Sequence, residues 1–189
     1  MEIQNLFTTL RQMAGSLSQP QVDSVNAILE ACSQHGVTDT HQIAYVLATA
    51  YHEARLKPVE EIGKGQGHPY GGMLKMAKDS NGNHIPYTTP NQIYYGRGLV
   101  QTTWYENYAQ FGKLLNIDLL NHPELALNTP VAAEIIVVGM KGGLFTGASL
   151  GRFFTPTSQD PINARKIING LDCAQLIAGY YSHILAGLI

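Results

Sequence analysis

The sequence predicts one mainly α-helical domain with two lobes around a cleft, one of them a small irregular lobe that contains a β-hairpin. Two observations support this prediction. Apolar residues recur at helical spacing along most of the chain, and its 189 residues suit one domain. Between residues 62 and 98 this spacing disappears, and the segment holds eight glycines and four tyrosines. We therefore expect residues 1–189 to form one catalytic domain, with the irregular lobe inserted between helices.

Six segments are expected to be helical. In residues 18–36, apolar side chains lie three and four positions apart, and Gly36 suits a helix end. Residues 38–58 begin with a Thr-Asp pair that can cap a helix, and Pro58 is expected to end it. This second segment is small or apolar nearly all round, which predicts a buried helix. The other expected helices are 102–116, 128–143, 159–170 and 172–189.

The irregular segment 62–98 has features of its own. Residues 78–87, KDSNGNHIPY, place an Asn-Gly turn between two short runs, which favours a small hairpin. A segment of this length without a helix is usually functional. We therefore expect it to have a functional role.

Charge is scarce in this chain. Charged residues make up 14% of it, against roughly a quarter in ordinary globular domains, and the formal net charge is −2. No cluster of Lys and Arg is present, so we expect neither nucleic acid nor an anionic membrane surface as a partner. Each charge in an apolar neighbourhood is correspondingly informative.

No stretch reaches the roughly 20 apolar residues that a membrane span needs, and the first 15 residues do not resemble a secretory signal. We expect a monomer that is made in the cytoplasm and acts outside it only after release. Cys32 and Cys173 match no metal spacing and are expected to be two buried thiols.

Three carboxylates gather in residues 52–61, HEARLKPVEE. Glu53 lies near the end of the buried helix, where burial and the helix dipole would raise its pKa, as a general acid requires. Glu60 and Glu61 follow in a loop, where a solvated carboxylate could act as a base. Two carboxylates in unlike environments are what glycoside hydrolysis uses. The residues alone leave two alternatives open. In the first, Glu53 points to solvent; in the second, Glu60 and Glu61 are an ordinary solvated acidic pair without a catalytic role.

A second cluster is YYGRGLVQTTW, residues 94–104. Two glycines flank Arg97, so the backbone there bends tightly or approaches another group closely. Aromatic rings beside Gln101, Thr102 and Thr103 suit a carbohydrate, whose faces are apolar and whose edges are hydroxyls. The alternative is a loop-to-helix junction with ordinary aromatic packing.

Three other motifs lack the neighbouring residues or elements that their function requires. His52-Glu53 starts like a zinc-protease helix, but Leu56 occupies the position of the second histidine. GASLG, residues 147–151, matches the serine-hydrolase pattern without the strand that must precede it. The calcium-like DSNGN at 79–83 lacks the later ligands. We therefore expect no metal and no cofactor.

The motifs AYHEA, EEIGKG, YYGRGLVQTTWYENY and INGLDCA, in this order, resemble glycoside hydrolase family 19. The resemblance runs from about residue 40 to the C-terminus. The family includes plant-type chitinases and phage endolysins that cut peptidoglycan. The resemblance implies a lysozyme-like, mainly α fold with a cleft between two lobes. It also implies an inverting mechanism, in which one carboxylic acid protonates the leaving oxygen and a second carboxylate activates water.

The resemblance also implies roles for individual residues. Glu53 matches the general acid, Glu61 rather than Glu60 matches the general base, and Thr103 matches the residue that helps to hold the attacking water. Whether Tyr95 and Arg97 contact substrate or support the fold stays open. The expected substrate-binding residues are Gln101, Asn107, Asn169, Tyr95, Arg97 and Trp104.

The leading hypothesis is a peptidoglycan glycosidase of endolysin or lysozyme type that cleaves β-1,4 bonds of the cell-wall glycan in the periplasm. The alternatives are a chitinase acting on poly-N-acetylglucosamine and a glycan-binding module without catalysis. Plant-type chitinases are secreted and disulfide-bonded, and their sugar-binding loops are longer. This chain has two cysteines and no recognisable secretory signal, which favours an endolysin released by lysis over a plant-type chitinase. A holin or an immunity protein would then be a partner.

Overall fold

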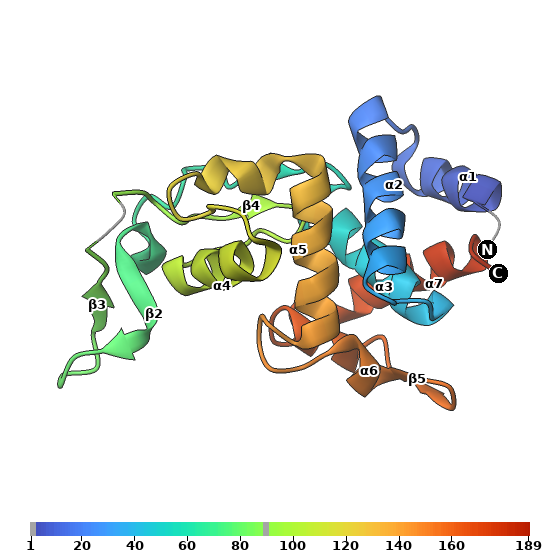
Figure 1. The fold of residues 1–189 in the computed structure, drawn as a ribbon. Helices are drawn as coiled ribbons and strands as arrows, with labels where there is room; N and C mark the ends of the chain where they lie inside the picture. Colours follow the sequence, from blue (N-terminus) through green and yellow to red (C-terminus); the bar gives the residue numbers. More distant parts are fainter. Residues whose placement is uncertain (1–2, 89–90) are drawn as a thin grey trace.

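The computed structural model describes residues 3–88 and 91–189, and its fold is mainly helical, as predicted (Figure 1). One end of the molecule is a group of helices in which α3 packs against α7, α2 and α5. Residues 89 and 90 of the predicted irregular lobe lie outside the described residues. The helices of this group are α1 (Ile3–Ala14), α2 (Gln19–Gln34), α3 (Thr40–Ala54), α5 (Thr129–Gly142) and α7 (Ala174–Ala186).

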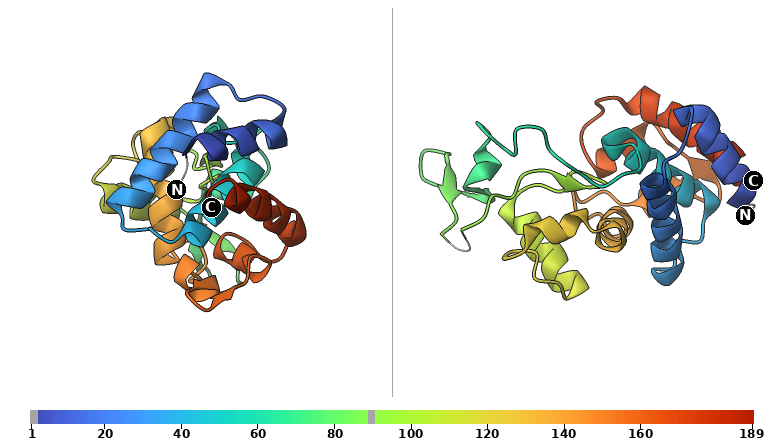
Figure 2. Two further views of the ribbon diagram at one scale, coloured as in Figure 1. Left: turned by 90° about the vertical axis from the view of Figure 1, so that its right-hand side faces the viewer. Right: turned by 90° about the horizontal axis from the view of Figure 1, so that it is seen from above.

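The predicted hairpin lies at the other end of the molecule, away from α1 and α7 (Figures 1 and 2). Strand β2 (Met73–Lys78) pairs antiparallel with β3 (His84–Pro86) around the Asn-Gly turn. The 3-10 turn η1 (Pro69–Gly71) and helix α4 (Tyr105–Leu115) both contact β2.

A two-residue strand pair lies between the two ends of the molecule, with β4 visible beside α5 and α4 in Figure 1. Strand β1 (Val59–Glu60) pairs antiparallel with β4 (Arg97–Gly98). This pairing brings the carboxylate stretch 52–61 beside the block 94–104, although some forty residues separate them in the chain. The remaining elements are η2 (Pro123–Leu127), α6 (Leu150–Phe153), β5 (Phe154–Thr155), β6 (Ser158–Gln159) and η3 (Asn163–Ile167).

Helix α3 begins where the sequence predicts and ends earlier than predicted. Asp39 caps it by accepting a hydrogen bond from the Gln42 N–H at 3.0 Å, and its middle is buried. The helix ends at Ala54, so the prediction that Pro58 ends it is wrong. Arg55 and Leu56 instead adopt left-handed conformations, with φ of 50° and 57°.

The reason for the early end of α3 is the packing of Leu56, which is 0% exposed. Burial of a leucine side chain stabilises a fold by about 1.5–3 kcal/mol. This offsets much of the roughly 1–2 kcal/mol that each left-handed residue costs. The core thus ends the helix early and leaves Glu53 in its last turn.

The predicted helix 159–170 is also wrong. The segment begins in β6, which pairs with β5, and its only helical part is the short 3-10 turn η3. Asp160 accepts a hydrogen bond from the Asn163 N–H at 3.0 Å, which starts that turn locally. Arg165 within η3 is 4% exposed and bonded to distant groups, so tertiary contacts override the helical pattern. Helices α1 and α6 are additional to the prediction.

The two cysteines differ, against the prediction of two buried thiols. Cys32 is buried on α2, and this burial raises its pKa to about 12. Cys173 is exposed immediately before α7. Both are free thiols. Among the described residues, no helix is both long enough and apolar enough to cross a bilayer.

Candidate active site

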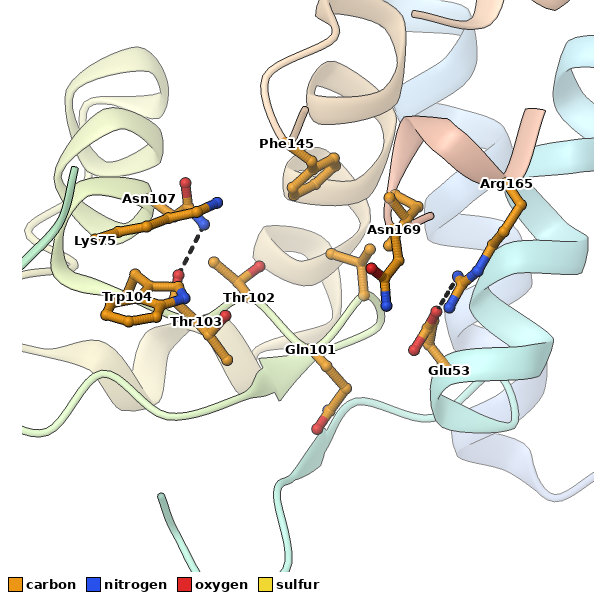
Figure 3. A pocket seen from close by; sticks show the side chains of 12 residues that line it. Glu53, Lys75, Gln101, Thr102, Thr103, Trp104, Asn107, Phe145, Arg165 and Asn169 are labelled. Atoms are coloured by element: carbon orange, nitrogen blue, oxygen red, sulfur yellow. Dashed lines mark hydrogen bonds and ion pairs between the residues drawn. The ribbon is translucent and has the colours of Figure 1, made fainter. Parts of the chain in front are cut away.

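A cleft of about 360 Å³ lies where the last turn of α3, the segment after β4 and the hairpin meet. Figure 3 shows Glu53 and Arg165 on one side of it and Trp104, Asn107 and Lys75 on the other. The residues that line it are Glu53, Lys75, Val100, Gln101, Thr102, Thr103, Trp104, Asn107, Phe145, Arg165, Ile168 and Asn169.

Glu53 is largely buried, with 17% of its side chain exposed, and it forms an ion pair. Arg165 Nη1 donates to Glu53 Oε1 at 2.5 Å, and Arg165 Nε donates to the carbonyl of Asp172 at 2.9 Å. Glu53 is therefore neither an isolated buried carboxyl nor a freely solvated one. The guanidinium holds the carboxylate at the cleft wall, as Figure 3 shows.

Glu61 follows β1 and is held by the pairing of β1 with β4. Its N–H donates to the Gly96 carbonyl at 2.8 Å, and the Gly96 N–H donates to Glu61 Oε2 at 2.9 Å. The Tyr70 hydroxyl donates to the other carboxylate oxygen, Oε1. The predicted solvated loop carboxylate is thus half-buried and hydrogen-bonded on both oxygens.

Gly96 brings Glu61 next to the cleft. A Cβ built at Gly96 would lie 2.9 Å from Gln101 Oε1 and 3.3 Å from Glu61 Oε2, so both side chains reach this glycine. Gln101 lines the cleft, which makes Glu61 a neighbour of the cleft wall. The prediction of a close backbone approach at the glycines beside Arg97 is confirmed.

Glu60 has a different set of partners. It accepts a hydrogen bond from the Tyr95 hydroxyl at 2.7 Å and pairs with Lys64 at 3.2 Å. The Tyr95 hydrogen bond and then the Lys64 contact lower the pKa of Glu60. Arg97 Nε also lies 4.0 Å from Glu60 Oε1. Glu60 therefore belongs to a structural cluster and not to the cleft.

Tyr95 and Arg97 lie behind the cleft and are not among the described residues that line it. Each is 6% exposed, and the Arg97 guanidinium carbon lies 3.5 Å from the centroid of the Tyr95 ring. Arg97 Nη1 donates to the Tyr108 hydroxyl at 3.1 Å. The sequence predicts that both residues bind substrate. The structure instead buries both behind the cleft, where cation–π stacking and hydrogen bonds hold them.

The other predicted residues do line the cleft. Thr103 and Trp104 precede α4, and Asn107 in the first turn of α4 donates to the Thr103 carbonyl at 2.8 Å. Gln101 Nε2 donates to the Val59 carbonyl at 3.0 Å, which ties it to β1. Asn169, just beyond η3, completes the set from the helical side. The cleft thus presents amide, hydroxyl and indole groups opposite a carboxylate.

Sequence reasoning misses Arg165, Lys75 and Phe145. Arg165 carried one usable signal, because it is one of only 12 Lys and Arg residues in a chain where charge is scarce. Lys75 comes from β2, and Phe145 from the loop after α5. No local pattern indicates which hairpin side chain faces a cleft, since that depends on how the hairpin docks.

Comparison with known proteins agrees with this fold. The family model described as Chitinase class I matches residues 31–141. Endochitinase CH5B of Phaseolus vulgaris is 35% identical over 92 residues, which are 48% of this chain and 26% of that protein. Endochitinase EP3 of Arabidopsis thaliana is 33% identical over 131 residues, 65% of this chain and 45% of that protein. The chain thus spans about a quarter to a half of the length of these relatives.

Solved structures show the same fold. Chitinase C from Streptomyces griseus HUT6037 superposes with a TM-score of 0.60 at 19% identity, over 96% of this chain and 90% of that one. A bacterial family 19 chitinase gives a TM-score of 0.58 at 22% identity, over 96% of this chain and 93% of that one. At these identities the likeness concerns the fold.

The helical fold with a carboxylate in its cleft thus has the architecture of the lysozyme-like glycoside hydrolases. More particularly, the chain belongs to glycoside hydrolase family 19, the family of the class I chitinases, whose model covers more than half of it.

Proposed function

We propose that this protein hydrolyses β-1,4 bonds between N-acetylglucosamine units of a chitin-type polymer, with inversion at the anomeric carbon. The observation that carries the proposal is the Glu53 carboxylate, held by Arg165 at one cleft wall and opposed by the Thr103, Trp104 and Asn107 wall. The chitinase names of the relatives favour chitin over the peptidoglycan hypothesis.

In the proposed mechanism Glu53, in its protonated form, delivers a proton to the leaving oxygen. Glu61, supported by Tyr70 and Gly96, accepts a proton from water that attacks the opposite face of the sugar. The Thr103 hydroxyl helps to hold this water. The indole of Trp104 offers an apolar face to a sugar ring, and the amides of Gln101, Asn107 and Asn169 offer donors and acceptors to its hydroxyls and acetamido group.

Arg165 orients the acid in this mechanism. Its guanidinium donates to Glu53 Oε1 and keeps the side chain at the cleft wall before substrate arrives.

Peptidoglycan is the second candidate substrate, because Lys75 places a cation on the cleft wall opposite Glu53. Chitin is uncharged, whereas the peptides of peptidoglycan carry carboxylates that an ammonium group can bind. On this second proposal the protein reaches the cell wall after release from the cell that makes it.

The test compares purified N-acetylglucosamine hexamer with purified sacculi, each assayed for new reducing ends. We expect wild-type protein to cleave the hexamer and to form the α-anomer first, as proton NMR of fresh digests would show. Glu53→Gln should lower kcat by about 10²–10⁴-fold, the usual contribution of a general acid. Wild-type activity in this variant would refute the assignment of the acid. Cleavage of sacculi without cleavage of the hexamer would identify peptidoglycan as the substrate.

A further inference from the structure

Tyr70 packs against the cleft residue Trp104, and sequence reasoning does not reveal its role. It lies in η1, nine positions after Glu61, and its hydroxyl donates to Glu61 Oε1. The other oxygen, Oε2, accepts the Gly96 N–H at 2.9 Å. One donor is thus a backbone group fixed by the pairing of β1 with β4, and the other is a side chain from a different segment.

The Tyr70 ring is fixed by packing that does not involve its hydroxyl. The His68 ring stacks on it with centroids 5.0 Å apart and an interplanar angle of 6°, and the Trp104 ring meets it edge-on at 5.6 Å. A Cβ at Gly65 would come within 3.1 Å of the ring, so the backbone also lies against it. These neighbours place the hydroxyl in one position before substrate arrives.

The hydroxyl of Tyr70 keeps its proton over the working range of pH. Burial raises its pKa to about 12, and the hydrogen bond to Glu61 acts in the same direction. The phenol is therefore a permanent donor and cannot compete with Glu61 as the base. An ionised carboxylate offers about four acceptor positions. With Tyr70 and Gly96 using two of them, one position on each oxygen remains for the attacking water.

We propose that Tyr70 is a positioning residue for the base, whose hydroxyl fixes the orientation of the Glu61 carboxylate so that a free lone pair faces the nucleophilic water. This inference rests on the proposed function, since it assigns Glu61 as the base. Without the Tyr70 hydroxyl, Glu61 retains only the Gly96 donor among the described residues, and its carboxylate can rotate about the terminal bond of the side chain. Trp104 lines the cleft and contacts Tyr70, so the support for the base is built from a wall that binds sugar.

The experiment is Tyr70→Phe, which removes the hydroxyl and keeps the ring between His68 and Trp104. We expect kcat on the hexamer to fall about 10- to 100-fold, the size expected when a hydrogen bond to a charged group is lost, with KM within twofold of wild type. The matched control is Tyr87→Phe, which removes a hydroxyl that donates to the Gln92 carbonyl in the same lobe. This control should retain wild-type kcat, and thermal unfolding of both variants checks that they are folded.

A double-mutant cycle with Glu61→Ala separates positioning from a merely structural role. If Tyr70 acts through Glu61, adding Tyr70→Phe to Glu61→Ala should lower kcat by less than twofold. An equal loss in both backgrounds, or a Tyr70→Phe enzyme with wild-type kcat, would overturn the inference and leave the proposed function standing. A Glu61→Ala enzyme with wild-type kcat would instead refute the base itself, and with it the proposed mechanism.

Discussion

Glu60 and Glu61 are neighbours in the chain whose carboxylates have different partners. Glu60 contacts Tyr95, Lys64 and Arg97 in the cluster behind the cleft. Glu61 contacts Tyr70 and Gly96 beside it. The alternation of side chains along an extended segment sends adjacent residues to opposite faces, which is why the two carboxylates have different partners.

We expect Glu61→Ala and Glu60→Ala to separate these two roles. Glu61→Ala should lower kcat at least 100-fold with little effect on stability, because it removes the base. Glu60→Ala should lower kcat less than about tenfold and cost about 1 kcal/mol of unfolding free energy, a value reduced for the partial exposure of Glu60. Hexamer kinetics and urea unfolding measure the two effects. The reverse pattern would move the base to Glu60.

Glu53 illustrates the limit of reasoning from neighbours in the chain. Its position in the last turn of a buried helix is visible in the sequence, and the structure places it in the cleft. Its ion-pair partner Arg165 lies 112 positions away in η3. Only the tertiary structure brings these two residues together, so no spacing along the chain reveals the ion pair.

At the scale of elements, the short pairing of β1 with β4 joins the two halves of the candidate site. Glu60 opposes Arg97 and Val59 opposes Gly98, which places Glu61 against Gly96. Gly98 adopts a φ of +87°, and a Cβ on it would lie 2.7 Å from the Ala126 carbonyl oxygen. The register of this pair therefore depends on a glycine that also packs against η2.

Gly98→Ala should therefore destabilise the protein by about 3 kcal/mol, since it combines a left-handed alanine with a backbone clash. Activity should fall as well, because displacement of β4 moves Gln101 and the Gly96 support of Glu61. Gly63→Ala is the matched control, since Gly63 has a φ of +85° and no atom within 4 Å of a built Cβ. It should cost only about 1–2 kcal/mol. Urea unfolding of both variants checks this, and equal losses would contradict a clash at Gly98.

Periodicity alone predicts α2, α3, α4, α5 and α7 to within a few residues, because each has a dominant apolar face or an apolar body. The same reasoning fails at 159–170, where bonds from Arg165 to Glu53 and to the Asp172 carbonyl replace a regular helix by a 3-10 turn. It also fails at Pro58, because burial of Leu56 ends α3 earlier. In both cases the contacts of a side chain with other parts of the fold outweigh the helical preference of the local sequence. Both segments lie next to the candidate site.

At the scale of the whole molecule, the helices and the hairpin contribute different parts of the cleft. The helical end supplies Glu53, Arg165 and Asn169, and the other end supplies Lys75, Trp104 and Asn107 (Figure 3). The carboxylate and its partner thus come from a closely packed core, whereas the opposite wall comes from a hairpin and the start of α4. On the proposed function, we therefore expect changes in the hairpin to alter substrate preference and to leave the position of Glu53 unchanged.

The packing of the whole chain also makes a prediction about its thiols. A thiol reagent such as iodoacetamide should modify Cys173 rapidly in the native protein, because it is exposed. Cys32 should react only after unfolding, because burial excludes the reagent and raises the thiol pKa to about 12. Mass spectrometry should show one modification before denaturation and two after it. Rapid modification of Cys32 in the native protein would contradict the packing of α2.

Spacing along the chain predicts the mainly helical class, the positions of most helices and the hairpin, because a single sequence displays that spacing. The candidate site residues Glu53, Gln101, Thr103, Trp104, Asn107 and Asn169 follow from motifs that resemble family 19. The ion pair of Arg165 with Glu53, the hydrogen bonds of Tyr70 and Gly96 to Glu61, and the burial of Tyr95 and Arg97 behind the cleft are visible only in the tertiary structure. These features depend on contacts between residues far apart in the chain, where packing and hydrogen bonding outweigh local preference.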